Sequence, residues 1–244
     1  MELNLLAAIT ATGSASIVIA TLAIGLGAAR SARIRIAAGL SLWFVLVVVL
    51  GATGALNYEH GLGVRGLGVA LIVPIAIFIL GVLYKRSWRE RLEAIPLSTL
   101  IGVNAVRVFG VIFIAMYAAE RLPAPFAPTA GWGDVLVGAT ALPVAWLAAR
   151  RKGTQTHAIV MFWNALGLLD LIAAVGLGVT SSPGPLRLIF AEPGTGLMTT
   201  LPWLLIPAFL VPLLASTHLA VFYRLRSTET PRVPATSRIA GLGR

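Results

Sequence analysis

Seven apolar blocks of about 20 residues, each bounded by charged or Gly/Pro-rich stretches, constrain this chain more than any other feature of its sequence. At about 1.5 Å of rise per residue, a helix of that length crosses a hydrocarbon core of about 30 Å. A hydrophobic fraction of 58% and a charged fraction of 11% do not describe a water-soluble surface. The sequence therefore predicts an all-α, polytopic integral membrane protein, a bundle of seven transmembrane helices.

The expected spans lie at residues 5–28, 36–56, 67–84, 95–119, 133–149, 158–179 and 200–223. They form one transmembrane domain, residues 1–227. Residues 228–244 contain Pro and Gly without apolar periodicity, which predicts a disordered cytoplasmic tail. Within the last span, Pro207 and Pro212 each remove a backbone hydrogen bond, so this span is expected to bend.

Basic residues are distributed unevenly among the connecting segments. The segments after the first, third, fifth and seventh spans carry 15 of the 19 Lys and Arg residues, the other loops carry three, and Arg107 lies within a span. Because cytoplasmic loops are rich in basic residues, we expect the amino terminus outside and the carboxyl terminus in the cytoplasm of a cell (plasma or inner) membrane. Most of the net charge of +10 then lies at the cytoplasmic ends of the spans, beside the lipid bilayer. It therefore predicts no nucleic-acid partner.

Small residues recur at helical spacing in the first span, at Ala8, Thr12, Ser16 and Ala20. Such a stripe lets two helix backbones approach closely. We expect it to pack within the bundle or at a dimer interface, which leaves a homo-oligomer possible.

Two cofactors are excluded by the sequence. Residues 61–66 match the dinucleotide fingerprint as a string, but the fingerprint needs a preceding strand, and this stretch joins two apolar blocks. Retinal needs a mid-membrane lysine for its Schiff base, and the only lysines, Lys85 and Lys152, lie at predicted span ends. Since there is no cysteine, no H-E-x-x-H metal motif and no recognisable catalytic constellation, neither a metal site nor an enzyme is predicted.

Haem remains an alternative because the chain has histidines near two span ends. His157 lies at the cytoplasmic mouth of the sixth span, and His218 lies about 7.5 Å into the seventh span from the same side. They could in principle face each other across a macrocycle as axial ligands. The competing interpretation is an interfacial histidine and a hydrogen bond between helices.

The strongest signal is a pair of opposite charges inside two spans. Arg107 lies 12 residues into the fourth span and Asp170 lies 12 residues into the sixth, each about 18 Å from the cytoplasmic edge. An isolated charge at this depth costs at least about 2.5–3.5 kcal/mol. We therefore expect the two side chains to pair and the two helices to be neighbours.

Two asparagines accompany these charges. Asn104 lies three residues before Arg107, on the same helix face and one turn closer to the cytoplasm. Asn164 lies about 120° around its helix from Asp170, so it is expected to reach a different neighbour.

Asp134, near the start of the fifth span, permits two interpretations. If its side chain points inward, two carboxylates flank Arg107, and the cluster could hold a proton or bind a cation. Alternatively, Asp134 caps the first turn of the fifth span.

These residues predict a buried polar site that binds or passes a small solute or proton, reached from the outer side. Arg107 would be its electrostatic anchor and Asp170 its counter-ion or proton carrier, while Asn104 and Asn164 form hydrogen bonds and Asp134 lies at the mouth. A purely structural ion pair that fixes helix register is the competing interpretation. Two further alternatives are a haem or redox protein that uses His157 and His218, and a structural or regulatory membrane subunit.

The predicted topology can be tested by cysteine labelling, since the chain has no cysteine of its own. Cysteine at position 60 or 185 should react with an impermeant reagent from outside. Cysteine at position 88 or 152 should react only after permeabilisation. Outside labelling at position 152 would contradict the seven-span topology.

Overall fold

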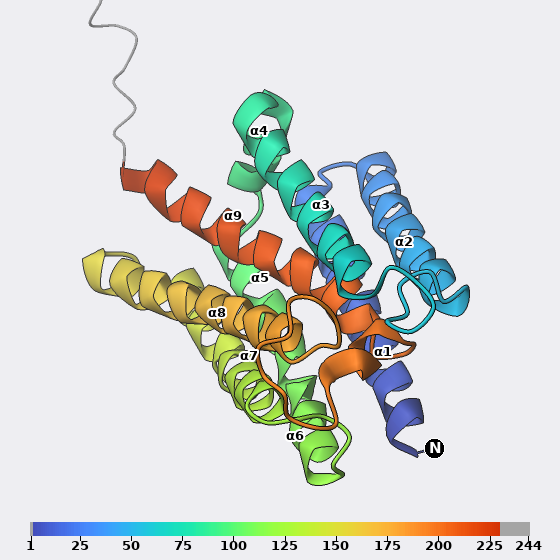
Figure 1. Ribbon diagram of the computed structural model, residues 1–244. Coiled ribbons are helices and arrows are strands. Elements are labelled where there is room, and N and C mark those ends of the chain that lie inside the picture. The colour runs from blue at the N-terminus through green and yellow to red at the C-terminus, as the bar shows by residue number, and fades with distance from the viewer. Residues whose placement is uncertain (1, 230–244) are drawn as a thin grey trace, which may run out of the picture.

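The computed structural model describes residues 2–229, and within that range it is built of helices and loops without a strand (Figure 1). The helices, in chain order, are α1 Glu2–Leu26, α2 Arg30–Ala52, α3 Gly63–Tyr84, α4 Arg86–Ala94, α5 Leu97–Gly102, the 3₁₀ helix η1 Val103–Gly110, α6 Val111–Ala118, α7 Phe126–Arg150, α8 Thr154–Thr180, the 3₁₀ helix η2 Thr195–Thr199, the π-helix η3 Ile206–Leu210 and α9 Val211–Glu229.

Seven of these helical segments are long and apolar enough to cross a membrane, which indicates a membrane protein. Five are the single helices α1, α2, α3, α7 and α8. The fourth is α5, η1 and α6 in succession, 97–118, and the seventh is η3 followed by α9, 206–227. The number of apolar helices and the all-helical class agree with the sequence prediction.

Some boundaries differ from the prediction. α7 begins at Phe126, seven residues before the predicted start of the fifth span, so Asp134 lies in its third turn. The interpretation of Asp134 as a helix cap is therefore wrong. At the other end of the chain, residues 228 and 229 complete α9, and the rest of the predicted disordered tail lies outside the described residues.

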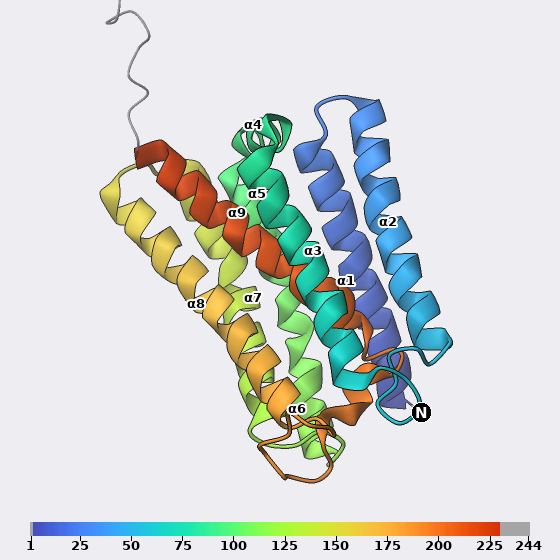
Figure 2. The same ribbon diagram turned by 45° about the horizontal axis from the view of Figure 1, so that its top comes forward.

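The fourth and seventh spans form the centre of the bundle. More than half of their apolar windows is buried, 56% and 61%, whereas the values for α2 and α3 are 6% and 11%. In Figures 1 and 2, α9 runs diagonally through the bundle between α3 and α8, and it also packs against α5. A polar side chain on either central span is thus shielded by surrounding helices.

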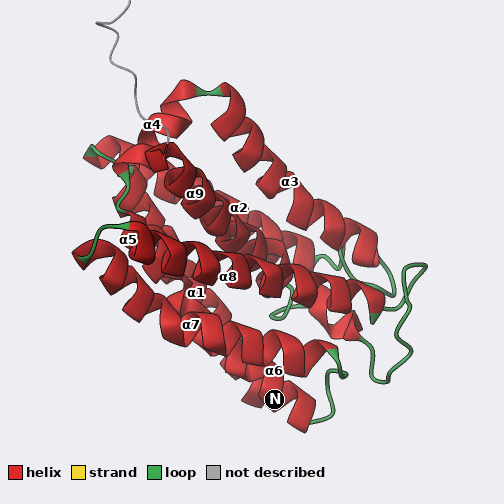
Figure 3. Ribbon diagram, turned by 90° about the vertical axis from the view of Figure 1, so that its left-hand side faces the viewer, coloured by secondary structure: helices red, strands yellow, loops and turns green. Residues whose placement is uncertain are grey.

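The two ends of the bundle differ in structure. The basic end carries the turn between α1 and α2, the short amphipathic helix α4, the turn between α7 and α8 and the end of α9. The loop end carries the loops 53–62 and 119–125 and the segment 181–205, which contains η2 (Figure 3). Helix α4 was not predicted, because its nine residues, Arg86–Ala94, are mostly polar and show no long apolar block.

The small-residue stripe that the sequence predicts in α1 does not face the interior of the bundle. Thr12, Ser16 and Ala20 are exposed. The buried face is one position earlier, at Ala7, Ala11 and Ala15. The hydrophobic pattern cannot separate these faces because both consist of small residues.

The seventh span is irregular where its prolines predict it. A π-helical segment, Ile206–Leu210, contains Pro207 and ends two residues before Pro212. The amide of Val211 donates to the carbonyl of Ile206, five residues back. The carbonyl of Trp203, which Pro207 cannot bond, accepts from the amide of Ile206 at 3.1 Å. A wider π-helical turn and a tighter turn thus give hydrogen bonds to backbone carbonyls near the prolines.

Arginines at the basic end satisfy helix-terminal carbonyls. Arg89 donates to the carbonyls of Val82 and Leu83, at the end of α3. Arg224 of α9 donates to the carbonyls of Leu92 and Ile95, at the junction of α4 and α5. These contacts fix α9, which also carries His218, against the start of the fourth span.

Replacing Arg224 tests this contact. Arg224→Gln should lower the free energy of unfolding in detergent micelles by about 1–3 kcal/mol, because partly buried carbonyls lose a charged donor. Arg226→Gln removes the same charge from an exposed position two residues on, and should change it by no more than about 0.5 kcal/mol. Equal losses in both variants would show that the carbonyl contacts do not fix α9.

Candidate functional site: an arginine-centred network

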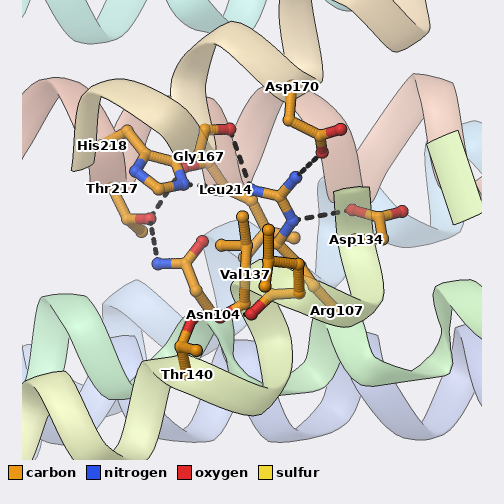
Figure 4. Close-up of polar contacts among 11 residues, drawn as sticks. Asn104, Arg107, Asp134, Val137, Thr140, Gly167, Asp170, Leu214, Thr217 and His218 are labelled. Atoms are coloured by element: carbon orange, nitrogen blue, oxygen red, sulfur yellow. Dashed lines mark hydrogen bonds and ion pairs between the residues drawn. The ribbon is translucent and has the colours of Figure 1, made fainter. Parts of the chain in front are cut away.

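Arg107 lies in the 3₁₀ helix η1, at the centre of the bundle, and its side chain is 1% exposed. Its Nε donates to Asp134 Oδ1 of α7 at 2.7 Å, and its Nη2 donates to Asp170 of α8 (Figure 4). Its Nη1 donates to the carbonyl of Gly167 at 3.0 Å and lies 3.2 Å from His218 Nε2 of α9. One guanidinium therefore joins η1 to three other helices.

The 3₁₀ geometry of η1 explains how Arg107 is presented. Side chains three residues apart eclipse one another in a 3₁₀ helix, so Asn104, Arg107 and Gly110 form one row. A Cβ on Gly110 would collide with Asp134. Glycine at this position therefore lets α7 approach η1 closely. Asp134 can then reach Arg107 from the side.

Glycines on α7 and α8 make room for the other partners. A Cβ on Gly133 would overlap the Asp170 carboxylate, and a Cβ on Gly167 would overlap the His218 imidazole. Absence of a side chain at Gly167 also exposes the carbonyl that Arg107 bonds. The network thus depends on backbone positions that cannot carry a larger residue without displacing a charged or aromatic partner.

His218 is fully buried and held from two sides. Its Nδ1 lies 2.8 Å from Asn164 Oδ1, and Asn164 Nδ2 donates to the His218 carbonyl at 3.0 Å. Arg107 can only donate, so Nε2 accepts and Nδ1 carries the proton. The contacts therefore require the neutral imidazole with hydrogen on Nδ1.

Asn104 extends the network towards the basic end. It is fully buried, and its Nδ2 donates to Thr217 Oγ1 at 3.1 Å and to the carbonyl of Leu100 at 3.0 Å (Figure 4). Its Oδ1 makes no hydrogen bond within residues 2–229. A buried acceptor without a partner costs about 1–3 kcal/mol, a cost that the two hydrogen bonds of Nδ2 help to offset.

The formal charges of the network do not cancel. Arg107 contributes one positive charge, and Asp134 and Asp170 contribute two negative charges at side-chain exposures of 17% and 13%. With His218 neutral, one negative charge remains. Binding of one proton or another monovalent cation would neutralise the cluster.

Two small cavities meet Asp134. One of about 50 Å³ is bordered by Arg107 and by α1 residues including Ser14. The other, of about 80 Å³, extends towards the loop end, where it is lined by Ser182, Thr195 and Thr199. Both can accommodate water molecules. The buried hydroxyl of Ser182 has no partner among the described residues, and water in the larger cavity would give it one.

The structure brings together all five residues singled out in the sequence and adds His218 as a direct contact of Arg107. Arg107 and Asp170 pair across two helices, as their depths predict. His157 lies in the first turn of α8, about 10 Å along that helix from Asn164, the residue that holds His218. Because both ring nitrogens of His218 are engaged, ligation of haem iron would require breaking one of these contacts.

Comparison with known proteins gives one match. Residues 64–226 match a family described as a domain of unknown function (DUF8737). The chain belongs to this family. The DUF8737 region begins in α3 and includes every residue of the Arg107 network, while α1 and α2 precede it. No curated protein and no solved structure matches the chain.

The charge balance of the Arg107 network predicts which of two substitutions lowers the free energy of unfolding more. Arg107→Met leaves two buried carboxylates without their cation and should lower the free energy of unfolding by about 3–5 kcal/mol. Asp170→Asn keeps the shape and leaves one positive and one negative charge, so its loss should be on the order of 1 kcal/mol. Chemical unfolding in detergent micelles measures both.

Glu192→Gln is the control for loss of a carboxylate. Glu192 lies in the loop 181–194, and the hydrogen bond and charge of Arg187 hold its pKa below the ordinary value, so the substitution removes a charge at neutral pH. An exposed pair contributes about 0–1 kcal/mol, so little change is expected. An equal or larger loss for Asp170→Asn than for Arg107→Met would contradict the charge balance given above.

Proposed function

We propose that this DUF8737 protein is a plasma- or inner-membrane protein that binds one proton at the Asp134 and Asp170 carboxylates. The observation that carries the proposal is the binding of one arginine by two carboxylates in the centre of the bundle, which leaves one formal negative charge. In a bilayer, an unbalanced buried charge is costly, and ionisable groups at such depth are typical of ion and proton pathways.

A proton suits this site better than a larger cation. The side chains of Asp134 and Asp170 pack closely against the backbone at Gly110 and Gly133. The adjoining cavities measure only about 50 and 80 Å³. His218 is committed as a neutral acceptor for Arg107. The proton is therefore assigned to a carboxylate, where it interrupts one of the two ion pairs.

Access is proposed from the outer side. The positive-inside rule assigns the basic end to the cytoplasm and the loop end to the outside. The cavity lined by Ser182, Thr195 and Thr199 lies between the loop end and Asp134, so Asp134 would exchange the proton with hydrated surroundings. Asp170 on the far side of Arg107 is the second acceptor. Arg107 anchors the site, and Asn104 and Asn164 orient Thr217 and His218 around it.

Infrared spectroscopy tests proton binding. A pH titration of the purified full chain should show one buried carboxyl becoming protonated, seen as a carboxylic-acid carbonyl stretch. Asp134→Asn and Asp170→Asn should each abolish that signal, because either change leaves a neutral cluster. Glu192→Gln should retain it. A titration that is identical in the wild type and in both aspartate variants would refute the assignment.

A flux measurement tests whether the proton also passes through. Liposomes that contain the protein and a trapped pH dye should acidify faster than empty liposomes when a membrane potential draws protons inward. Asp134→Asn should reduce the rate to that of empty liposomes, while Glu192→Gln should not. If the wild type conducts no faster than empty liposomes but shows the infrared signal, the site binds a proton without transporting it.

A further inference from the structure

A long apolar groove lies between α2 and α3, separate from the Arg107 network. Figures 1 and 2 show these two helices standing apart, with α1 and α9 behind them. The groove has a volume of about 820 Å³ and reaches from Leu56 and Leu62 at the loop end to α4 at the basic end. This volume lies within the range of about 300–1,000 Å³ that is typical of small-molecule sites.

The bundle's own side chains leave the groove open. Val47 is the one buried residue of α2, and the buried residues of α3 are three glycines and Val64. Gly39 lines the groove, and a Cβ added there would meet no atom within 4 Å. An apolar surface of this size on both helices needs an apolar occupant or lipid to cover it.

Among the described residues, the hydroxyl groups on the floor of the groove already donate their hydrogens. Ser216 and Thr217 of α9 line it, but their hydroxyls donate to the carbonyls of Pro212 at 2.8 Å and Leu214 at 2.7 Å. Apart from two glycines and the two arginines at its basic end, the remaining lining residues are aliphatic or aromatic, as in Trp43 and Phe78. A hydrocarbon chain fits such a wall.

The basic end of the groove has a different chemistry. Arg35, Arg91 and Trp88 line it there, and no acidic side chain of the described residues does so. Both arginines are exposed, and neither makes a side-chain hydrogen bond or ion pair within residues 2–229. Neighbouring arginines differ, because Arg33 and Arg89 donate to backbone carbonyls.

We propose that this groove binds a membrane phospholipid with an anionic headgroup. The acyl chain lies along α2 and α3, and the phosphate lies at the basic end, where it accepts from Arg35 and Arg91. Basic pockets between transmembrane helices bind lipid headgroups in this way, and arginine pairs with phosphate through two parallel hydrogen bonds. The proposal does not rest on the proton site, and the groove uses none of the charged residues of that site.

Native mass spectrometry of the full chain in detergent tests the proposal. Phosphatidylglycerol should bind at one molecule per chain, and phosphatidylcholine with the same acyl chains should bind more weakly. Inorganic phosphate should neither bind nor compete, because the acyl chain contributes most of the affinity. Equal binding of both lipids, or competition by inorganic phosphate, would overturn the proposal.

Two sets of variants separate the contribution of the lipid headgroup to binding from that of the acyl chain. Arg35→Gln with Arg91→Gln should weaken phosphatidylglycerol binding by about 30-fold and leave phosphatidylcholine unchanged. The control, Arg150→Gln with Arg151→Gln, removes two exposed arginines at the same end that do not line the groove, and should have no effect. Equal effects of the two double variants would show a general surface attraction and overturn the site.

Gly39→Leu fills the groove and should abolish binding of both lipids, while the open space around Gly39 lets the chain fold. Gly13→Leu is the matched control, since Gly13 of α1 also has open space around it and does not line the groove. Unchanged lipid binding by Gly39→Leu would overturn the proposal. A lipid-free dimer that Gly39→Leu dissociates would also overturn it, by making a second copy the occupant.

Discussion

The burial of one guanidinium organises the centre of this protein. A guanidinium such as that of Arg107 is costly to leave unpaired in an apolar core. Four of its contacts come from α7, α8 and α9, so these helices must meet η1 at one level for the charge to be satisfied. Apolar packing alone allows each helix to slide or rotate, whereas this set of donors and acceptors permits one register.

The close approach that Arg107 requires depends on small residues as much as on charged ones. Gly110, Gly133 and Gly167 each occupy a position where a Cβ would collide with Asp134, Asp170 or His218. Gly138 similarly lies against the backbone of Arg107 and Val108. Such positions let polar groups on neighbouring helices make direct contacts. The charged and the small residues therefore form one structural unit.

Much of this arrangement follows from the sequence. The apolar blocks set the number of spans, and depth along them predicts that Arg107 and Asp170 meet. Asp134 and His218 are harder to place because depth depends on helix ends. α7 starts seven residues earlier than its hydropathy suggests, which moves Asp134 from a cap into the third turn. The last apolar helix continues to Ser227, so His218 lies about 14 Å from that end rather than about 7.5 Å.

α9 joins the two sites proposed here. Thr217 lines the apolar groove and accepts a hydrogen bond from Asn104, and the next residue, His218, contacts Arg107. The span that contains α9 also begins with the π-helix η3, and η1 opposite it is a 3₁₀ helix, so both central spans depart from α-helical geometry near the network. Because Thr217 and His218 are adjacent on α9, the placement of this one helix sets both the wall of the groove and the contact with Arg107.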